Sequence, residues 1–237
     1  ATSMNIDDPA TIAQFAAAVR NRSYMETLLL FTYVDSKGTS EESWNGWKAS
    51  LMLQLYRFTL RFFEDQEGFA AKLKRPPDEL QESVRAKLGE KFNEEVDAHF
   101  HTMPERYFRF RGAKSVSRHV KLFRRFFEIL AKDPAKSLEP TLAWQERPDE
   151  GFSLLEVCSW NRGQLMARVA GALSARNINI LSADLFSRAD DLVLDIFRVC
   201  TTRFTPVTSK RDIAEVQNLL ATESGTDFHQ LIAEARD

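Results

Sequence analysis

The sequence has few of the residues that build disulfide-stapled or metal-centred folds. It contains 2 cysteines and 4 histidines among 237 residues. Cys158 and Cys200 lie inside separate predicted strands, which excludes a disulfide framework and a zinc ribbon, so both are expected to be buried, reduced thiols. The histidines form no His-Asp pair and no His-x-x-x-His spacing, so a complete metal site cannot be built from them. They are His99, His101, His119 and His229.

Long apolar runs and a strong charge bias are absent too. No stretch approaches the roughly 18 residues of a membrane-spanning helix, and the polar start Ala1–Asn5 is not typical of a signal peptide. The formal net charge of -2 gives no overall attraction to nucleic acid or to a membrane. We therefore expect a cytoplasmic protein without a membrane partner, long enough for one large or two small cores.

Helical patterns fill the first half of the chain. Residues 9–33 predict one or two helices, opened by Asp8-Pro9. A second apolar series at alternating three- and four-residue spacing predicts a long amphipathic helix. Its members are Trp44, Trp47, Leu51, Leu55, Phe58 and Phe62. Pro76-Pro77 breaks the pattern before a shorter helix toward Leu88, and the prolines of residues 139–148 predict a linker.

A β-rich block follows the linker. Phe152–Cys158 predicts a strand, Leu165–Leu173 has helical periodicity, and Ile178–Ser187 and Leu192–Cys200 predict two strands joined by a tight turn. A second helix is expected from about Ser209. The order β-α-β-β-α is that of a ferredoxin-like unit, with helices on one face of an antiparallel sheet.

The amino-acid sequence of this block is more specific than its secondary-structure pattern. Residues 158–173, Asn177-Ile-Asn-Ile-Leu-Ser-Ala-Asp184 and Leu194-Asp-Ile-Phe-Arg-Val199 resemble the first ACT domain of the bifunctional PII uridylyltransferase/uridylyl-removing enzymes. Upstream, residues 7–12, 28–35 and 44–48 are similar to the end of that family's HD phosphohydrolase domain. His101–Phe108 resembles the family's connector.

The resemblance implies an α+β fold in three parts. Residues 1–65 would be the C-terminal part of the HD domain, 66–148 a helical connector, and 149–237 an ACT domain lacking its last strand. Without that strand, Phe152–Cys158 would be a sheet edge, open to a second ACT domain in cis or in trans. The parent enzyme would use UTP and a divalent metal, Mg or Mn, act on PII, and respond to glutamine.

Two candidate sites follow from the resemblance. Asp35 matches the late-helix aspartate that completes the metal site of HD phosphohydrolases, where carboxylate and imidazole ligands hold a metal that activates water. The alternative is an ordinary helix-terminal aspartate. Because the upstream histidines and the paired nucleotidyltransferase aspartates are not in this sequence, we expect no complete catalytic set in the chain itself.

The second candidate is the loop that would bind an amino acid. It comprises Asn161, Arg162, Gly163, Gln164 and Leu165, next to a helix N-terminus that offers backbone donors to a carboxylate. The family usually has Asp-Arg-Pro-Gly-Leu here, so this chain loses one carboxylate and places Gln164 where glycine is usual. We expect glutamine binding at this copy to be weak or shared with a second copy, and a purely structural turn is the alternative.

The segment Arg106–Phe127 has eight Lys or Arg residues, no acidic residue and several aromatics. Such a run is compatible with a nucleic-acid surface. The aromatics are, however, spaced like core residues, and arginine stems often lie along a core. We therefore expect nucleic acid not to be a partner. A non-catalytic ACT-containing protein that senses amino acids or binds a partner is the main alternative to an enzyme fragment.

Overall fold

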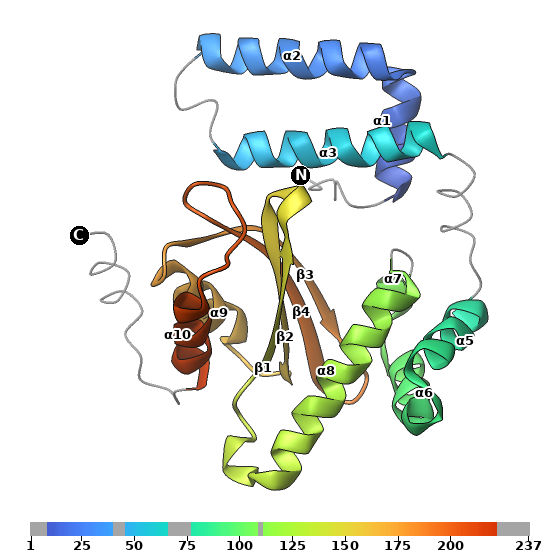
Figure 1. Cartoon of the computed structure of the whole chain (residues 1–237), viewed down its shortest axis with the longest axis vertical. Helices are drawn as coiled ribbons and strands as arrows, with labels where there is room; N and C mark the ends of the chain where they lie inside the picture. The colour runs from blue at the N-terminus through green and yellow to red at the C-terminus, as the bar shows by residue number, and fades with distance from the viewer. Residues whose placement is uncertain (1–8, 40–45, 66–76, 109–110, 222–237) are drawn as a thin grey trace. The chain divides into compact units, whose positions relative to one another are not determined.

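The computed structural model describes residues 9–39, 46–65, 77–108 and 111–221. The chain divides into two compact units, Ala1–Pro76 and Pro77–Asp237 (Figure 1). None of the described helices is long and apolar enough to cross a membrane.

The described residues of the first unit form three helices, and the predicted helical stretch over 9–33 is confirmed. It is divided where Arg20 adopts a left-handed conformation with φ 65°. The second helix continues through Thr39, beyond the end predicted at residue 33. The helices are α1 (Pro9–Val19), α2 (Arg22–Thr39) and α3 (Gly46–Glu64).

The core of the first unit is small. Its buried apolar side chains are Ile12, Ala16, Val19 and Met25. The apolar series of α3 is half-buried from Leu51 onward, whereas Trp44 and the side chain of Trp47 lie outside the described part. Tyr56 donates a hydrogen bond of 2.8 Å from its hydroxyl to Glu26, which ties α3 to α2.

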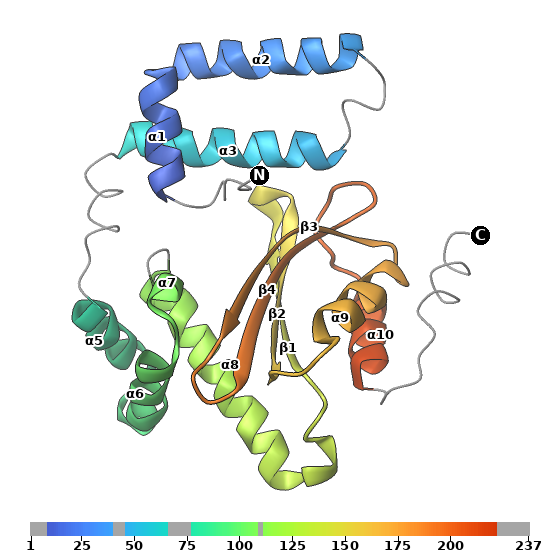
Figure 2. The same cartoon turned by 180° about the vertical axis from the view of Figure 1, so that it is seen from behind.

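The second unit has three layers, with a four-stranded antiparallel sheet of order β1-β2-β4-β3 in the middle and helices on both of its faces. Figure 2 shows α8 on one side of the sheet and α9 and α10 on the other. The strands are β1 (Thr141–Arg147), β2 (Phe152–Trp160), β3 (Ile178–Ser187) and β4 (Leu192–Thr201). The longer helices are α5 (Pro77–Leu88), α6 (Asn93–Thr102), α8 (Ala113–Lys132), α9 (Leu165–Ser174) and α10 (Lys210–Ala221). The short turns are η2 (Glu90–Phe92), α7 (Glu105–Phe108), η3 (Pro134–Lys136) and η4 (Pro148–Glu150).

The predicted α+β fold with a βαββα unit is confirmed by β2-α9-β3-β4-α10. The linker predicted over residues 139–148 is wrong, because Thr141–Arg147 forms β1 and pairs antiparallel with β2. The prediction that β2 is a sheet edge is wrong for the same reason. The strand that precedes β2 in the sequence takes the edge position beside β2, and the sheet has four strands within the described residues.

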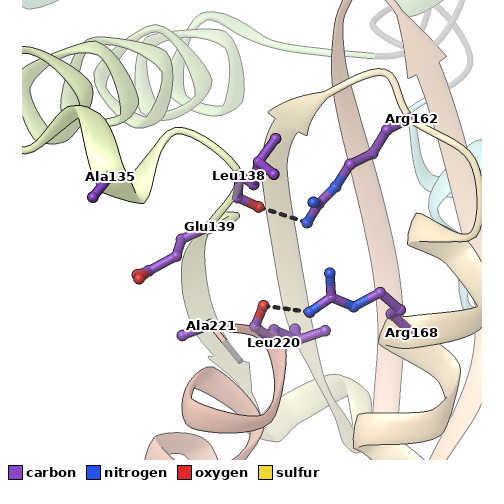
Figure 3. Close-up of a pocket in the computed structure, with 7 residues that line it drawn as sticks. All are labelled: Ala135, Leu138, Glu139, Arg162, Arg168, Leu220 and Ala221. Carbon is purple, nitrogen blue, oxygen red and sulfur yellow. Dashed lines mark hydrogen bonds between the residues drawn. The ribbon is translucent and has the colours of Figure 1, made fainter. Parts of the chain in front are cut away.

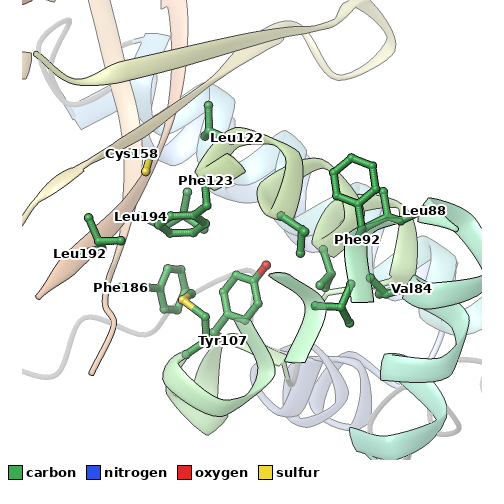
Figure 4. Close-up of a cluster of buried hydrophobic side chains, with 14 of the residues drawn as sticks. Val84, Leu88, Phe92, Tyr107, Leu122, Phe123, Cys158, Phe186, Leu192 and Leu194 are labelled. Atoms are coloured by element: carbon green, nitrogen blue, oxygen red, sulfur yellow. The ribbon is translucent and has the colours of Figure 1, made fainter. Parts of the chain in front are cut away.

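The two faces of the sheet have separate cores. Alternation along β4 sends Leu194 and Ile196 toward α5–α8 and sends Phe197 and Val199 toward α9 and α10. Figure 4 shows Leu192 and Leu194 facing the helices that carry Phe123 and Val84. The segment predicted as a connector therefore covers one face of the sheet. Cys158 and Cys200 are buried, free thiols, as expected.

Candidate functional site

The predicted amino-acid loop lies between β2 and α9 and is largely open to solvent. Asn161, Gly163 and Gln164 are exposed, Arg162 is half-buried, and Leu165 is buried at the first position of α9. The backbone N–H of Asn161 donates to the carbonyl of Asp191 at 2.6 Å, which holds the loop against the β3–β4 turn. The structure thus presents the loop at a helix N-terminus, as the sequence suggested, but whether it binds a ligand stays a prediction.

A shallow pocket lies beside this loop (Figure 3). Arg162 donates to the carbonyl of Leu138 at 2.5 Å, and Arg168 donates to the carbonyl of Leu220 at 3.0 Å. The pocket has a cavity volume of about 30 Å³, far below the roughly 300–1,000 Å³ of typical small-molecule sites. Each arginine already binds a backbone carbonyl, so a ligand carboxylate would have to compete for it.

Gln164 occupies a backbone conformation that favours glycine. Its φ of 67° and ψ of 0° are left-handed, and it makes no side-chain cap to α9. A side chain costs about 1 kcal/mol or more in this region because its β-carbon approaches the following carbonyl. The departure from the family's glycine therefore adds strain at the start of α9.

Replacing Gln164 by glycine is expected to stabilise the second unit by about 0.5–1 kcal/mol, because the strain is released at a modest entropic cost. Urea unfolding at pH 7 measures the change. Gly163→Ala is the matched control, since a β-carbon there meets nothing within 4 Å and φ is not positive. A destabilised Gln164→Gly protein would contradict the strain at this position.

Asp35 lies in the C-terminal half of α2 and is exposed. Its backbone carbonyl accepts a hydrogen bond of 2.8 Å from the Thr39 hydroxyl. Across the described ranges, no group of three or more His, Cys, Asp or Glu side chains is placed to hold a metal. The role of Asp35 as a metal ligand therefore stays a prediction that needs residues from outside this sequence.

Half of the basic residues in the run Arg106–Phe127 serve the fold. Arg106 stacks on Phe186 at 5.0 Å, and Arg111 pairs with Asp184 at 3.3 Å. Arg118 pairs with Glu156, and Arg124 pairs with Glu95 at 3.2 Å. Lys114, Lys121 and Arg125 are exposed, and Arg109 lies outside the described residues.

The aromatics of the run are also largely structural. Tyr107, Phe123 and Phe126 are buried, whereas Phe127 is 42% exposed. The helix therefore turns Phe126 toward the sheet and leaves Phe127 at the surface. Phe110 lies outside the described part of the chain. These contacts favour arginines packed along a core over a stacking surface for bases.

The sequence analysis missed a buried polar chain between the helices and the sheet. His99, Tyr107, His119 and Glu156 are each at most 1% exposed. The Tyr107 hydroxyl lies 3.0 Å from His99 Nε2 and 2.7 Å from His119 Nδ1. His119 Nε2 lies 3.1 Å from Glu156 Oε1. Arg118 Nε completes the chain, at 2.9 Å from both Glu156 carboxylate oxygens.

The hydrogen bonds of this chain have one consistent direction. Glu156 is ionised beside Arg118, so His119 donates to it from Nε2 and accepts at Nδ1 from the Tyr107 hydroxyl. The Tyr107 oxygen then accepts from His99 Nε2. His99 Nδ1 is left as a lone pair, buried with no hydrogen-bond partner among the described residues.

The pKa values of these groups follow from their burial. Desolvation lowers the pKa of His119 to about 4 and that of His99 well below 6.5, and it raises the pKa of Tyr107. Desolvation opposes ionisation of Glu156, but its bonds to His119 and Arg118 prevail and lower its pKa to about 2. At neutral pH the imidazoles of His99 and His119 and the phenol of Tyr107 are therefore neutral, and Glu156 and Arg118 form an ion pair.

The sequence pattern of the histidines indicated no buried role for them, yet His99 and His119 are almost completely buried. A single glutamate in the apolar strand Phe152–Trp160 was the one available signal, because a charge in such a strand needs a buried partner. Its partners are 37 and 38 residues away in the sequence. Because the side chains of this buried polar chain are almost completely shielded from solvent, they cannot reach a substrate, and they do not form a catalytic site.

Comparison with known proteins finds relatives for most of the chain. A bifunctional uridylyltransferase/uridylyl-removing enzyme of Aliivibrio fischeri (strain ATCC 700601 / ES114) is 30% identical over 216 residues, covering 87% of this chain and 23% of that protein. The protein of the same name in Idiomarina loihiensis is 27% identical, covering 91% of this chain and 24% of its own length. The one in Caulobacter vibrioides (strain NA1000 / CB15N) is 28% identical, covering 82% and 20%.

These similarities confirm the resemblance inferred from the motifs. The chain spans roughly a fifth to a quarter of the length of these relatives. No family model matches the sequence. No solved structure matches it either.

Proposed function

We propose that this chain is the part of a bifunctional PII uridylyltransferase/uridylyl-removing enzyme that joins the end of its HD hydrolase domain to an ACT-type regulatory sheet. The observation that carries the proposal is the similarity to enzymes of that name over 82–91% of the chain. The α+β unit that starts at β2 supports it, because its element order is that of a regulatory ferredoxin-like module.

In this proposal the parent enzyme transfers UMP from UTP to PII when glutamine is scarce and hydrolyses it off when glutamine is abundant. Asp35 would be one carboxylate ligand of the Mg or Mn ion that activates the hydrolytic water. The chain would act in the cytoplasm with PII as its protein substrate. Its own residues would contribute one metal ligand and the regulatory sheet.

The isolated chain is expected to release no UMP from uridylylated PII, because Asp35 has no metal-binding neighbours in the described residues. The assay measures UMP in the presence of Mg or Mn against a sample without protein. Metal-dependent release of UMP by the isolated chain would contradict this prediction. Reading the coding DNA on both sides tests the parent: in-frame HD histidines and a Gly-Ser nucleotidyltransferase motif are expected.

We further propose that the loop Asn161–Leu165 binds glutamine weakly or only together with a second ACT copy. The small pocket and the engaged guanidinium groups of Arg162 and Arg168 support weak binding. Calorimetry of the full chain with glutamine tests it, and tight binding would contradict it. A non-catalytic amino-acid-sensing protein is the second candidate, favoured by the exposed position of Asp35.

A further inference from the structure

The buried polar chain joins four elements and adds hydrogen bonds and an ion pair to the apolar contacts between them. His99 comes from α6, Tyr107 from α7, His119 and Arg118 from α8, and Glu156 from β2. Every link therefore crosses from one element to another. The ion pair between Arg118 and Glu156 connects the helical layer to the sheet.

We propose that the buried polar chain of His99, Tyr107, His119, Glu156 and Arg118 is a proton-sensitive latch that fastens the helical layer α6–α8 to the sheet. Its directional hydrogen bonds allow only one protonation state. If His119 gains a proton at Nδ1, the Tyr107 hydroxyl loses its acceptor and faces two N–H donors instead of one. The same proton also leaves the site with an uncompensated charge, because Arg118 already neutralises Glu156.

The surrounding charges do not relieve that extra proton. The positive charge of Arg111 disfavours protonation of His119, and that of Arg188 disfavours protonation of His99. Their own carboxylates, Asp184 and Asp190, are engaged with them at 3.3 and 2.7 Å. On the helical side, His119 also opposes protonation of His99.

The pH range of the latch follows from the histidines. An unfolded histidine takes up a proton near pH 6.5, whereas folded His119 does so only near pH 4. The open state therefore binds more protons, and stability falls as the pH drops through this window. Asp195 on β4 acts oppositely between about pH 6 and 4, because burial raises its pKa to about 6. Comparing variants with the natural chain removes that common contribution.

The first test uses the full chain with His99→Leu, which removes one titrating group at the end of the latch. Its unfolding free energy is expected to depend on pH between 6.5 and 5 by about one proton less than that of the natural chain. His101→Asn is the matched control, since His101 is exposed on the same helix. An unchanged pH dependence in His99→Leu, or an equal loss in His101→Asn, would overturn the latch.

Two measurements on the unaltered chain do not depend on a variant that folds. In NMR titration, His99 and His119 are expected to take up protons well below pH 6.5, His119 near pH 4. In hydrogen exchange between pH 7 and 5, corrected for intrinsic rates, amides of α8 are expected to lose protection roughly 30-fold more than those of α9. Four histidines that titrate near pH 6.5, or equal loss in both helices, would refute the proposal.

Discussion

Replacing Glu156 by glutamine is expected to lower the free energy of unfolding of the second unit by about 3 kcal/mol. The amide keeps the size of the side chain but removes the negative charge that compensates Arg118, and breaking a buried pair from one side costs roughly 3–5 kcal/mol. The expected loss of stability lies at the lower end of this range because the Arg118 side chain is 25% exposed and retains contact with water. With the amide oxygen kept toward His119, the amide nitrogen also presents a donor to the Nε–H of Arg118, where the carboxylate has an acceptor.

Urea unfolding at pH 7, followed by circular dichroism, measures this loss. Glu146→Gln is the matched control, because Glu146 is an exposed glutamate on the neighbouring strand β1. We expect that control to stay within about 0.5 kcal/mol of the natural chain. Equal stability of the two variants would mean that the ion pair between α8 and β2 contributes little to holding the layers together.

Replacing Leu142 by alanine is expected to destabilise the second unit by about 2–3 kcal/mol. Leu142 is 6% exposed, pairs with Val157 in the register of β1 and β2, and belongs to the core beneath α9 and α10. Removing a buried leucine side chain costs its transfer free energy and leaves a cavity. If residues 139–148 were a linker, the same substitution would have almost no effect.

Leu138→Ala provides the comparison within the same segment. Leu138 is 44% exposed, and its backbone carbonyl, which accepts the hydrogen bond from Arg162, is unchanged by the substitution. Thermal or urea unfolding of both variants is expected to separate them by about 2 kcal/mol. Similar unfolding midpoints for the two would argue against β1 as an integral strand of the sheet.

Local signals were enough to place most elements of the fold. The predicted strand Ile178–Ser187 matches β3, and Leu192–Cys200 matches β4 to within one residue. The helix after the candidate loop and the one after Ser209 were also predicted correctly. Periodicity sufficed there because each element buries one regular face.

Position in the sheet could not be predicted in the same way. The prolines at residues 140 and 148 are turn signals, but they flank a seven-residue strand instead of marking a linker. Whether such a segment becomes a strand depends on a partner with free backbone groups, and β2 supplies that partner through a short turn. Pairing of this kind is a property of two segments, so neither segment's composition reveals it.

The sequence by itself determined the βαββα order, the reduced cysteines and the family that the chain resembles, because these depend on neighbouring residues and on local periodicity. Only the tertiary structure decided that the connector covers a face of the sheet and that His99, Tyr107, His119 and Glu156 meet. The physical reason is desolvation. A histidine or glutamate is polar in the sequence, and only the elements that surround it remove the water and supply its hydrogen-bond partners.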